Sequence, residues 1–293
     1  MKRFATYLFS LLALVVAQAL VLDYVNVALI RSSSGSSAYK MERLYANPEP
    51  DELAIVGSSR ACGNFVPSLI ATNCFNYGVN GMTMGETISI LRVLQKRRTT
   101  APVIVNFDPW GSFFDSQAAD YRLAPQSGRV GLLDRVPGIR FFGSLRKHIV
   151  GYLNVRRSVT SVVDRGAVLL KNSRTAAEWQ SINAKLEPHA YNAHPQLEQA
   201  FLRLLQDFAP RRVFVVIAPC SKRWTDIFKE RGRLEKAVSA MRKIPNVTVF
   251  NYYGSSQFTD ADFTDPTHFN IKGARRFSAE LKLKLQHAAL DTP

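Results

Sequence analysis

The sequence is poor in cysteine. Its 293 residues include 3 cysteines, Cys62, Cys74 and Cys220, and none forms a Cys-x-x-Cys pair or a metal-spaced cluster with histidine. Because structural metal sites show such spacing, the sequence indicates no metal ion, and it implies no organic cofactor either. Outside the cytosol Cys62 and Cys74 could form a disulfide. The alternative is that both are buried free thiols.

Acidic residues are also scarce, with 23 Asp and Glu against 38 Lys and Arg, which gives a net charge of +15. A basic surface favours anionic partners such as phospholipid headgroups, acidic polysaccharides or nucleic acid. The sequence lacks zinc-finger, RNP and recognition-helix patterns, and its basic pairs are dispersed, as in Arg97-Arg98 and Arg275-Arg276. Nucleic acid is therefore not an expected partner. Internal repeats and long low-complexity runs are absent too, and 46% hydrophobic residues indicate a globular chain.

Charge is absent from the stretch between Phe4 and Leu22, which follows Lys2-Arg3. At ~1.5 Å per helical residue this stretch spans a bilayer core. The positive-inside rule places the N-terminus in the cytosol. We therefore expect residues 1–30 to be a single-pass anchor in the cytoplasmic membrane, with the C-terminal domain in the periplasm or outside the cell. The alternative is a cleaved signal peptide, for which Ala17-Gln18-Ala19 would be the cleavage site.

The rest of the chain divides into a linker and one domain. Residues 31–48 contain a serine-rich run and predict a flexible linker. Residues 49–290 alternate apolar segments typical of strands with helical patterns, which predicts an α/β fold with a doubly wound parallel sheet. The predicted strands are residues 53–56, 74–77, 103–107, 213–218 and 247–250. Residues 112–195 fit this alternation poorly and predict an insertion that caps or borders a site.

Two short motifs carry the chemistry. Gly57-Ser58-Ser59 follows the first predicted strand, and Asp265-x-x-His268 precedes the last predicted helix. A serine nucleophile needs an imidazole to take its proton, and the imidazole needs an acceptor that fixes its tautomer. In parallel sheets ligands bind beyond the carboxyl ends of the strands. Gly78 to Gly81 also follows a predicted strand, so it converges on the same edge.

The order of Gly57-Ser58-Ser59-Arg60 and Asp265-x-x-His268 resembles the SGNH/GDSL hydrolase superfamily, in a branch with Gly-Ser-Ser-Arg where other members carry Gly-Asp-Ser. Similar proteins in this branch are membrane-anchored bacterial proteins of envelope-polymer acylation, such as alginate O-acetylation and teichoic-acid D-alanylation proteins. The resemblance covers roughly residues 50–290 through three short blocks. It implies a flavodoxin-like sheet, with Ser59 as nucleophile, His268 as general base and Asp265 as its partner.

The oxyanion donors follow the family pattern only in part. The backbone N–H of Ser59 is one candidate, and Gly81 is a second because Gly78-x-x-Gly81 resembles the family's glycine block. The family's Gly-x-Asn-Asp block should follow the third strand, where this chain reads Asn106-Phe107-Asp108-Pro109-Trp110. We expect Asn106 or Asn80 to substitute. We also expect three nearby side chains to bind substrate, with the tryptophan lining an acyl pocket: Arg60, Asp108 and Trp110.

Two functions are compatible with these residues. The first is a membrane-anchored, extracytoplasmic acyl-esterase or O-acyltransferase that acts on a cell-envelope glycan, with acetyl groups implied by the resemblance. Its partners would be an anionic or acylated glycan and a membrane-embedded acyltransferase that supplies the acyl group. The second is a non-catalytic assembly protein that binds a glycan or a partner. The basic charge and the missing asparagine block favour the second function, whereas the set of Ser59, Asp265 and His268 favours the first.

Overall fold

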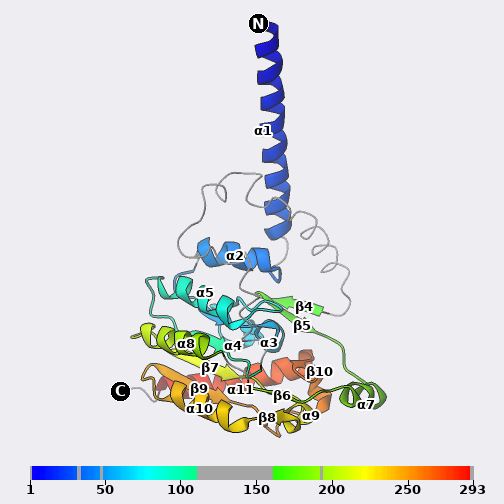
Figure 1. The fold of residues 1–293 in the computed structure, drawn as a ribbon, viewed down its shortest axis with the longest axis vertical. Coiled ribbons are helices and arrows are strands. Elements are labelled where there is room, and N and C mark those ends of the chain that lie inside the picture. The colour runs from blue at the N-terminus through cyan, green and yellow to red at the C-terminus, as the bar shows by residue number, and fades with distance from the viewer. Residues whose placement is uncertain (1, 32–33, 47–48, 111–160, 192–193, 291–293) are drawn as a thin grey trace.

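The computed structural model describes residues 2–31, 34–46, 49–110, 161–191 and 194–290. Helix α1 (Lys2–Arg31) projects from the body of the molecule (Figure 1). Within it, Arg3–Leu22 has a mean hydropathy of 2.2 and is not buried against the protein. By length and composition this helix could cross a membrane, as the sequence predicts.

A five-stranded parallel sheet forms the centre of the body. The strand order is β2-β1-β3-β7-β9, and every neighbouring pair is parallel. This is the flavodoxin-like order, so the predicted α/β fold with a doubly wound parallel sheet is confirmed. The strands are β1 (Leu53–Val56), β2 (Cys74–Asn76), β3 (Val103–Asn106), β7 (Val213–Ile217) and β9 (Val247–Asn251).

Helices cover both faces of the sheet (Figure 1). Successive strand residues point to opposite faces, so Ala54 and Val56 join one apolar cluster while Ile55 joins the other. This double burial explains why the strands are continuous apolar runs. The first cluster contains side chains of α5 (Met84–Gln95), α8 (Pro195–Asp207) and α10 (Arg231–Arg242), and the second contains side chains of α3 (Ser59–Asn64), α4 (Pro67–Ile70) and α11 (Ile271–Leu290).

Part of the predicted linker is a helix that packs on the body. Helix α2 (Ser37–Ala46) buries Met41 and Leu44 in the first cluster. Its Arg43 forms an ion pair with Glu52 at 2.6 Å. The serine run misled the prediction because Ser36 accepts a hydrogen bond from the backbone N–H of Tyr39, which is a cap interaction at the start of the helix. The flexible linker predicted for residues 31–48 is therefore wrong over α2.

The predicted insertion at 112–195 lies mostly outside the described residues. Its described part includes an antiparallel pair, β4 (Ser161–Asp164) and β5 (Ala167–Leu170), and helix α7 (Ala176–Ala184). Ala167 and Leu169 of β5 and Trp179 of α7 are buried in the same cluster as Ala61 of α3. This part of the insertion therefore packs beside the helix that follows β1.

The remaining short elements lie in the segments that follow α7, β7 and β9. They are β6 (His189–Ala190), α9 (Lys222–Asp226), β8 (Phe228–Lys229), the 3-10 helix η5 (Asp260–Asp262), β10 (Phe263–Asp265) and β11 (His268–Phe269). Cys62, Cys74 and Cys220 are all buried free thiols, so the disulfide alternative does not hold in this structure.

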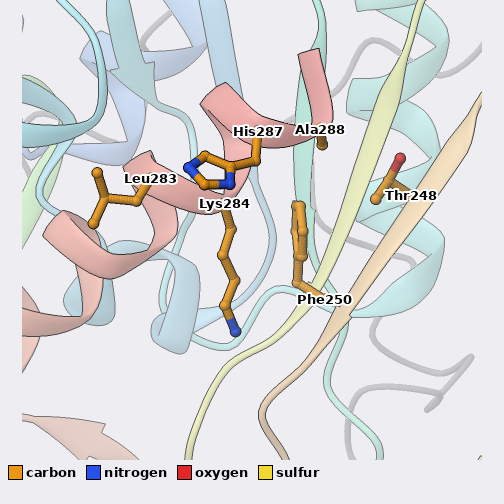
Figure 2. Close-up of a pocket in the computed structure, with 6 residues that line it drawn as sticks. All are labelled: Thr248, Phe250, Leu283, Lys284, His287 and Ala288. Atoms are coloured by element: carbon orange, nitrogen blue, oxygen red, sulfur yellow. The ribbon is translucent and has the colours of Figure 1, made fainter. Parts of the chain in front are cut away.

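An open cavity of about 360 Å³ lies between β9 and the C-terminal half of α11 (Figure 2). Near it, Arg212 donates a hydrogen bond to the carbonyl oxygen of Ala288 at 2.6 Å. Arg212 directly precedes β7, so this end of α11 lies at the amino ends of the strands. The cavity is therefore separate from the predicted catalytic residues. It is lined by Thr248, Phe250, Leu283, Lys284, His287 and Ala288.

Candidate active site

Ser59 is placed by a tight turn between β1 and α3. Gly57 has φ +147°, and a Cβ there would lie 2.8 Å from the carbonyl oxygen of Asn106, so a larger residue would be strained. Ser58 caps α3, and its hydroxyl accepts a hydrogen bond from the backbone N–H of Arg60 at 3.3 Å. The capped turn puts Ser59 at the first helical position, at the carboxyl end of β1.

Asp265 is the last residue of β10 and His268 the first residue of β11, so the two flank the turn between these strands. The carboxylate of Asp265 accepts hydrogen bonds from the backbone N–H groups of Thr267 at 2.9 Å and His268 at 3.0 Å. Burial alone would raise the pKa of Asp265, but hydrogen bonds from the His268 ring and from these backbone groups outweigh burial and lower its pKa to about 2. Asp265 is therefore ionised near neutral pH and can orient the imidazole.

The three predicted catalytic side chains lie in series. The distance from Ser59 Oγ to His268 Nε2 is 2.8 Å, and the distance from His268 Nδ1 to Asp265 Oδ2 is 2.9 Å. With its proton on Nδ1 donated to Asp265, the imidazole can accept the Ser59 hydroxyl proton at Nε2. The side chains of His268 and Asp265 are 22% and 38% exposed, so the site is open to solvent. This arrangement can perform nucleophilic acyl chemistry.

Arg60 joins the segments that carry these residues. Its guanidinium forms an ion pair with Asp108 after β3 at 2.7 Å and donates to the carbonyl oxygens of Ala218 at 2.5 Å and Pro219 at 2.8 Å after β7. Its Nε donates to the carbonyl oxygen of Thr267, the neighbour of His268, at 3.2 Å. One side chain thus connects the nucleophile turn, two strand ends and the histidine loop.

The predicted substrate-binding role does not fit Arg60 or Asp108. Their side chains are each 1% exposed, and their partners are protein groups. Asp108 also accepts hydrogen bonds from Ser58 Oγ and from Asn106 Nδ2, the second at 2.9 Å. A charged pair that is this buried and this well bonded holds backbone segments in place. Asn106 is fully buried in the same group, which fits a structural role better than that of an oxyanion donor.

The glycine loop, residues 78–81, packs against the nucleophile segment. A Cβ at Gly78 would lie 2.6 Å from Ala61 Cβ and 2.7 Å from the backbone nitrogen of Cys62, so only glycine permits this approach. The backbone N–H of Val79 donates to the carbonyl oxygen of Gly57 at 3.1 Å. Gly81 has φ +76° and is exposed, as is Asn80. Their part in binding an oxyanion, like that of the Ser59 N–H, stays a prediction.

Trp110 lies in an aromatic group beside this site. Its ring centroid is 4.6 Å from Arg60 Cζ and 5.7 Å from the ring of Trp224. His189 stacks on Trp224 at 3.9 Å. Trp110 is half-buried, so a role in lining an acyl pocket stays a prediction. Trp224 was not predicted, because α9 has five residues and too little periodicity to be recognised.

Two further residues of the site escaped prediction. Asn64 donates to the carbonyl oxygen of Thr267 at 3.1 Å and accepts from the backbone N–H of Phe269 at 2.9 Å, so it clamps the histidine loop to α3. Lys40 of α2 donates to the carbonyl oxygen of Gly78. The sequence did contain an indication that Lys40 faces the body: it precedes the apolar Leu44 by four residues, so the two share one face of a helix.

No model of a known protein family matches the chain, and no curated protein matches it. Among solved structures, a lipase/acylhydrolase from Enterococcus faecalis is similar, with 11% sequence identity and a TM-score of 0.38. The alignment covers 81% of this chain and 96% of the Enterococcus faecalis chain. A Streptococcus pneumonia structure, described as that of a candidate platelet activating factor, is similar at 10% identity and a TM-score of 0.43, covering 92% of this chain and 98% of its own. At TM-scores this low the likeness carries no argument about chemistry, for which the geometry of the site is the guide.

Proposed function

We propose that this chain is a Ser-His-Asp acyl-esterase or O-acyltransferase of the SGNH type, anchored in the cytoplasmic membrane by α1 and acting on a cell-envelope glycan outside it. The observation that supports the chemistry is the serial contact of Ser59, His268 and Asp265 at 2.8 and 2.9 Å. The observations that support the setting are the apolar helix and the net charge of +15, which favours an anionic glycan.

The reaction proceeds in two steps. Ser59 Oγ attacks the carbonyl carbon of an ester while His268 Nε2 takes the hydroxyl proton, and a tetrahedral oxyanion forms. The oxyanion collapses, the ester oxygen leaves with the proton from His268, and an acyl-serine remains. In the second step a sugar hydroxyl or water loses its proton to His268 and attacks the acyl-serine. The bond to Ser59 Oγ then breaks, Ser59 takes the proton back from His268, and the acylated sugar or the free acid leaves. The proposed acyl group is acetyl, and a membrane-embedded acyltransferase is the proposed partner that supplies the acyl donor.

The test uses the full-length protein in detergent with a chromogenic acetyl ester, with and without an acidic polysaccharide as acceptor. Release of the chromophore measures acylation of the enzyme, and mass spectrometry of the polysaccharide measures transfer. We expect chromophore release by the wild type and none above background by Ser59→Ala. A wild-type rate equal to that of Ser59→Ala would contradict an enzyme of this type.

The second candidate function is a non-catalytic assembly protein that binds the glycan or a partner. It is favoured by the basic charge and by the lack of the Gly-x-Asn-Asp block, since Asn106 is buried and bonded to Asp108. Polymer modification in cells distinguishes the two functions. A Ser59→Ala strain that modifies its polymer fully would support the binding function, and a strain that loses modification would support the enzyme.

A further inference from the structure

Lys40 is a buried lysine that forms no ion pair with a carboxylate of the described part of the chain. Its side chain is 1% exposed, and among the described residues no carboxylate lies within ion-pair distance of it. Lysine is rarely buried to this extent unless it is paired, because removing an ammonium group from water is costly. Burial accordingly lowers the pKa of Lys40. A side chain that is held at such a cost is a candidate for a role beyond packing.

The two partners of Lys40 belong to the glycine loop and to α3, the helix that begins with Ser59. Its ammonium group donates to the carbonyl oxygen of Gly78, at the start of the glycine loop, and lies 3.5 Å from Cys62 Sγ. Cys62 is in α3, about one helical turn after Ser59. The end of β2, which leads into the glycine loop, is also joined to α3 by a hydrogen bond from Asn76 Nδ2 to the carbonyl oxygen of Ala61, at 2.7 Å. Lys40 therefore bridges the contact between the glycine loop and the nucleophile helix.

Arg43, one turn further along α2, makes a different attachment. Its guanidinium bonds to Glu52 at 2.6 and 2.8 Å and to Glu49 at 3.0 Å. Glu52 directly precedes β1, so these bonds lie at the amino end of that strand and not at the end that carries Ser59. Arg43 thus holds α2 on the body, whereas Lys40 contacts the segments beside the predicted catalytic serine.

We propose that Lys40 is a positioning residue for the Ser59 site, which makes α2, the helix that follows the apolar helix, part of the catalytic scaffold. This inference rests on the proposed function. The loop that Lys40 holds carries Asn80 and Gly81, the predicted oxyanion donors. A displacement of about 1 Å in a catalytic group can reduce the rate about a hundredfold, so the position of this loop matters to catalysis.

The test compares Lys40→Met with Arg43→Met in the full-length protein in detergent. Methionine keeps most of the length of either side chain and removes the charge and the hydrogen bonds. For the acetyl ester we expect Lys40→Met to lower kcat by about tenfold or more while KM changes by less than about threefold. Its melting temperature should change little, because the desolvation cost of the buried ammonium group is removed together with its hydrogen bond to Gly78. Arg43→Met should lower the melting temperature and change kcat by less than about twofold.

Hydrogen exchange of the backbone amides supplies a readout that does not depend on turnover. We expect faster exchange over residues 77–82 in Lys40→Met than in the wild type, and faster exchange over α2 but not over residues 77–82 in Arg43→Met. Unchanged exchange over residues 77–82 in Lys40→Met overturns the inference, as does a kcat that falls equally in both variants. A wild type that is inactive on the ester, combined with the expected exchange pattern, overturns the proposed function and leaves the positioning contact supported.

Discussion

Helix α11 links two ends of the sheet that carry different chemistry, and each end has a histidine. His268 lies just before the helix and contacts Ser59 and Asp265. His287, in the last turn, is exposed and lines the open cavity, whose six lining residues include no carboxylate (Figure 2). The loops after parallel strands converge only at their carboxyl ends, so an imidazole there meets groups from several strands. The comparison shows that position in the fold, more than residue type, gives a histidine its chemistry.

The largest effect should come from removing the serial contact at the carboxyl end. Ser59→Ala and His268→Ala should each lower kcat for the acetyl ester by about a thousandfold or more, and the double variant should be little worse, because the groups act as one unit. Ester hydrolysis measures this, with thermal melting as the folding control. Full activity of Ser59→Ala together with an inactive Ser58→Ala would show that the other serine is the nucleophile.

Arg60→Met should lower the free energy of unfolding, because Arg60 joins segments at the carboxyl ends of the strands. The substitution leaves Asp108 buried without its cation, which typically costs about 3–5 kcal/mol of the free energy of unfolding. Urea unfolding followed by tryptophan fluorescence measures the loss. Arg60→Met/Asp108→Leu is the matched control, and it should recover much of the stability because no unpaired charge remains. A loss below about 1 kcal/mol in the single variant would mean that the pair does not hold the strand ends together.

Asp265→Asn should lower the stability of the fold above pH ~4, and its difference from the wild type should shrink as the pH falls towards 2. The pKa of Asp265 is about 2 in the folded protein, below the value of about 3.9 for an unperturbed aspartate. Its ionised form therefore stabilises the fold above pH ~4, and this contribution is lost as the pH falls towards 2. Melting temperatures from pH 5 to 2 should fall less steeply in Asp265→Asn than in the wild type. Parallel curves for the two proteins would argue against the hydrogen bonds assigned to this carboxylate.

The smallest effect should come from the other end of α11. His287→Ala should leave kcat and KM for the ester within about twofold of the wild type, because the cavity lies at the amino ends of the strands. Ester kinetics under the conditions used for His268→Ala provide the comparison. A loss of activity as large as that of His268→Ala would remove the distinction between the two ends.

The fold was predictable because the strands are short and buried on both faces, so they stand out as continuous apolar runs. Helix α2 was not, because a serine run that caps a short helix looks like a linker in the sequence. Recognising it would have required the spacing of Lys40, Met41 and Leu44.

For the site, the two motifs predicted which side chains gather at the carboxyl edge, and the structure gives their distances. The role of Arg60 could not be predicted in the same way. A cation next to a candidate nucleophile resembles a substrate ligand, and its burial depends on carbonyl groups at Ala218 and Pro219, far away in the chain. Residues 112–160 of the predicted insertion lie outside the described residues.

The packing of α2 on the body limits how far the active site can move from a membrane. In the proposed orientation, the chain between the end of α1 at Arg31 and the start of α2 at Ser37 is residues 32–36. Fully extended, such a segment reaches at most about 20 Å, whereas the predicted 31–48 linker would have reached about 60 Å. Under the proposed function, a connection this short would confine the reaction to glycan hydroxyls close to the bilayer surface rather than those deeper in the envelope.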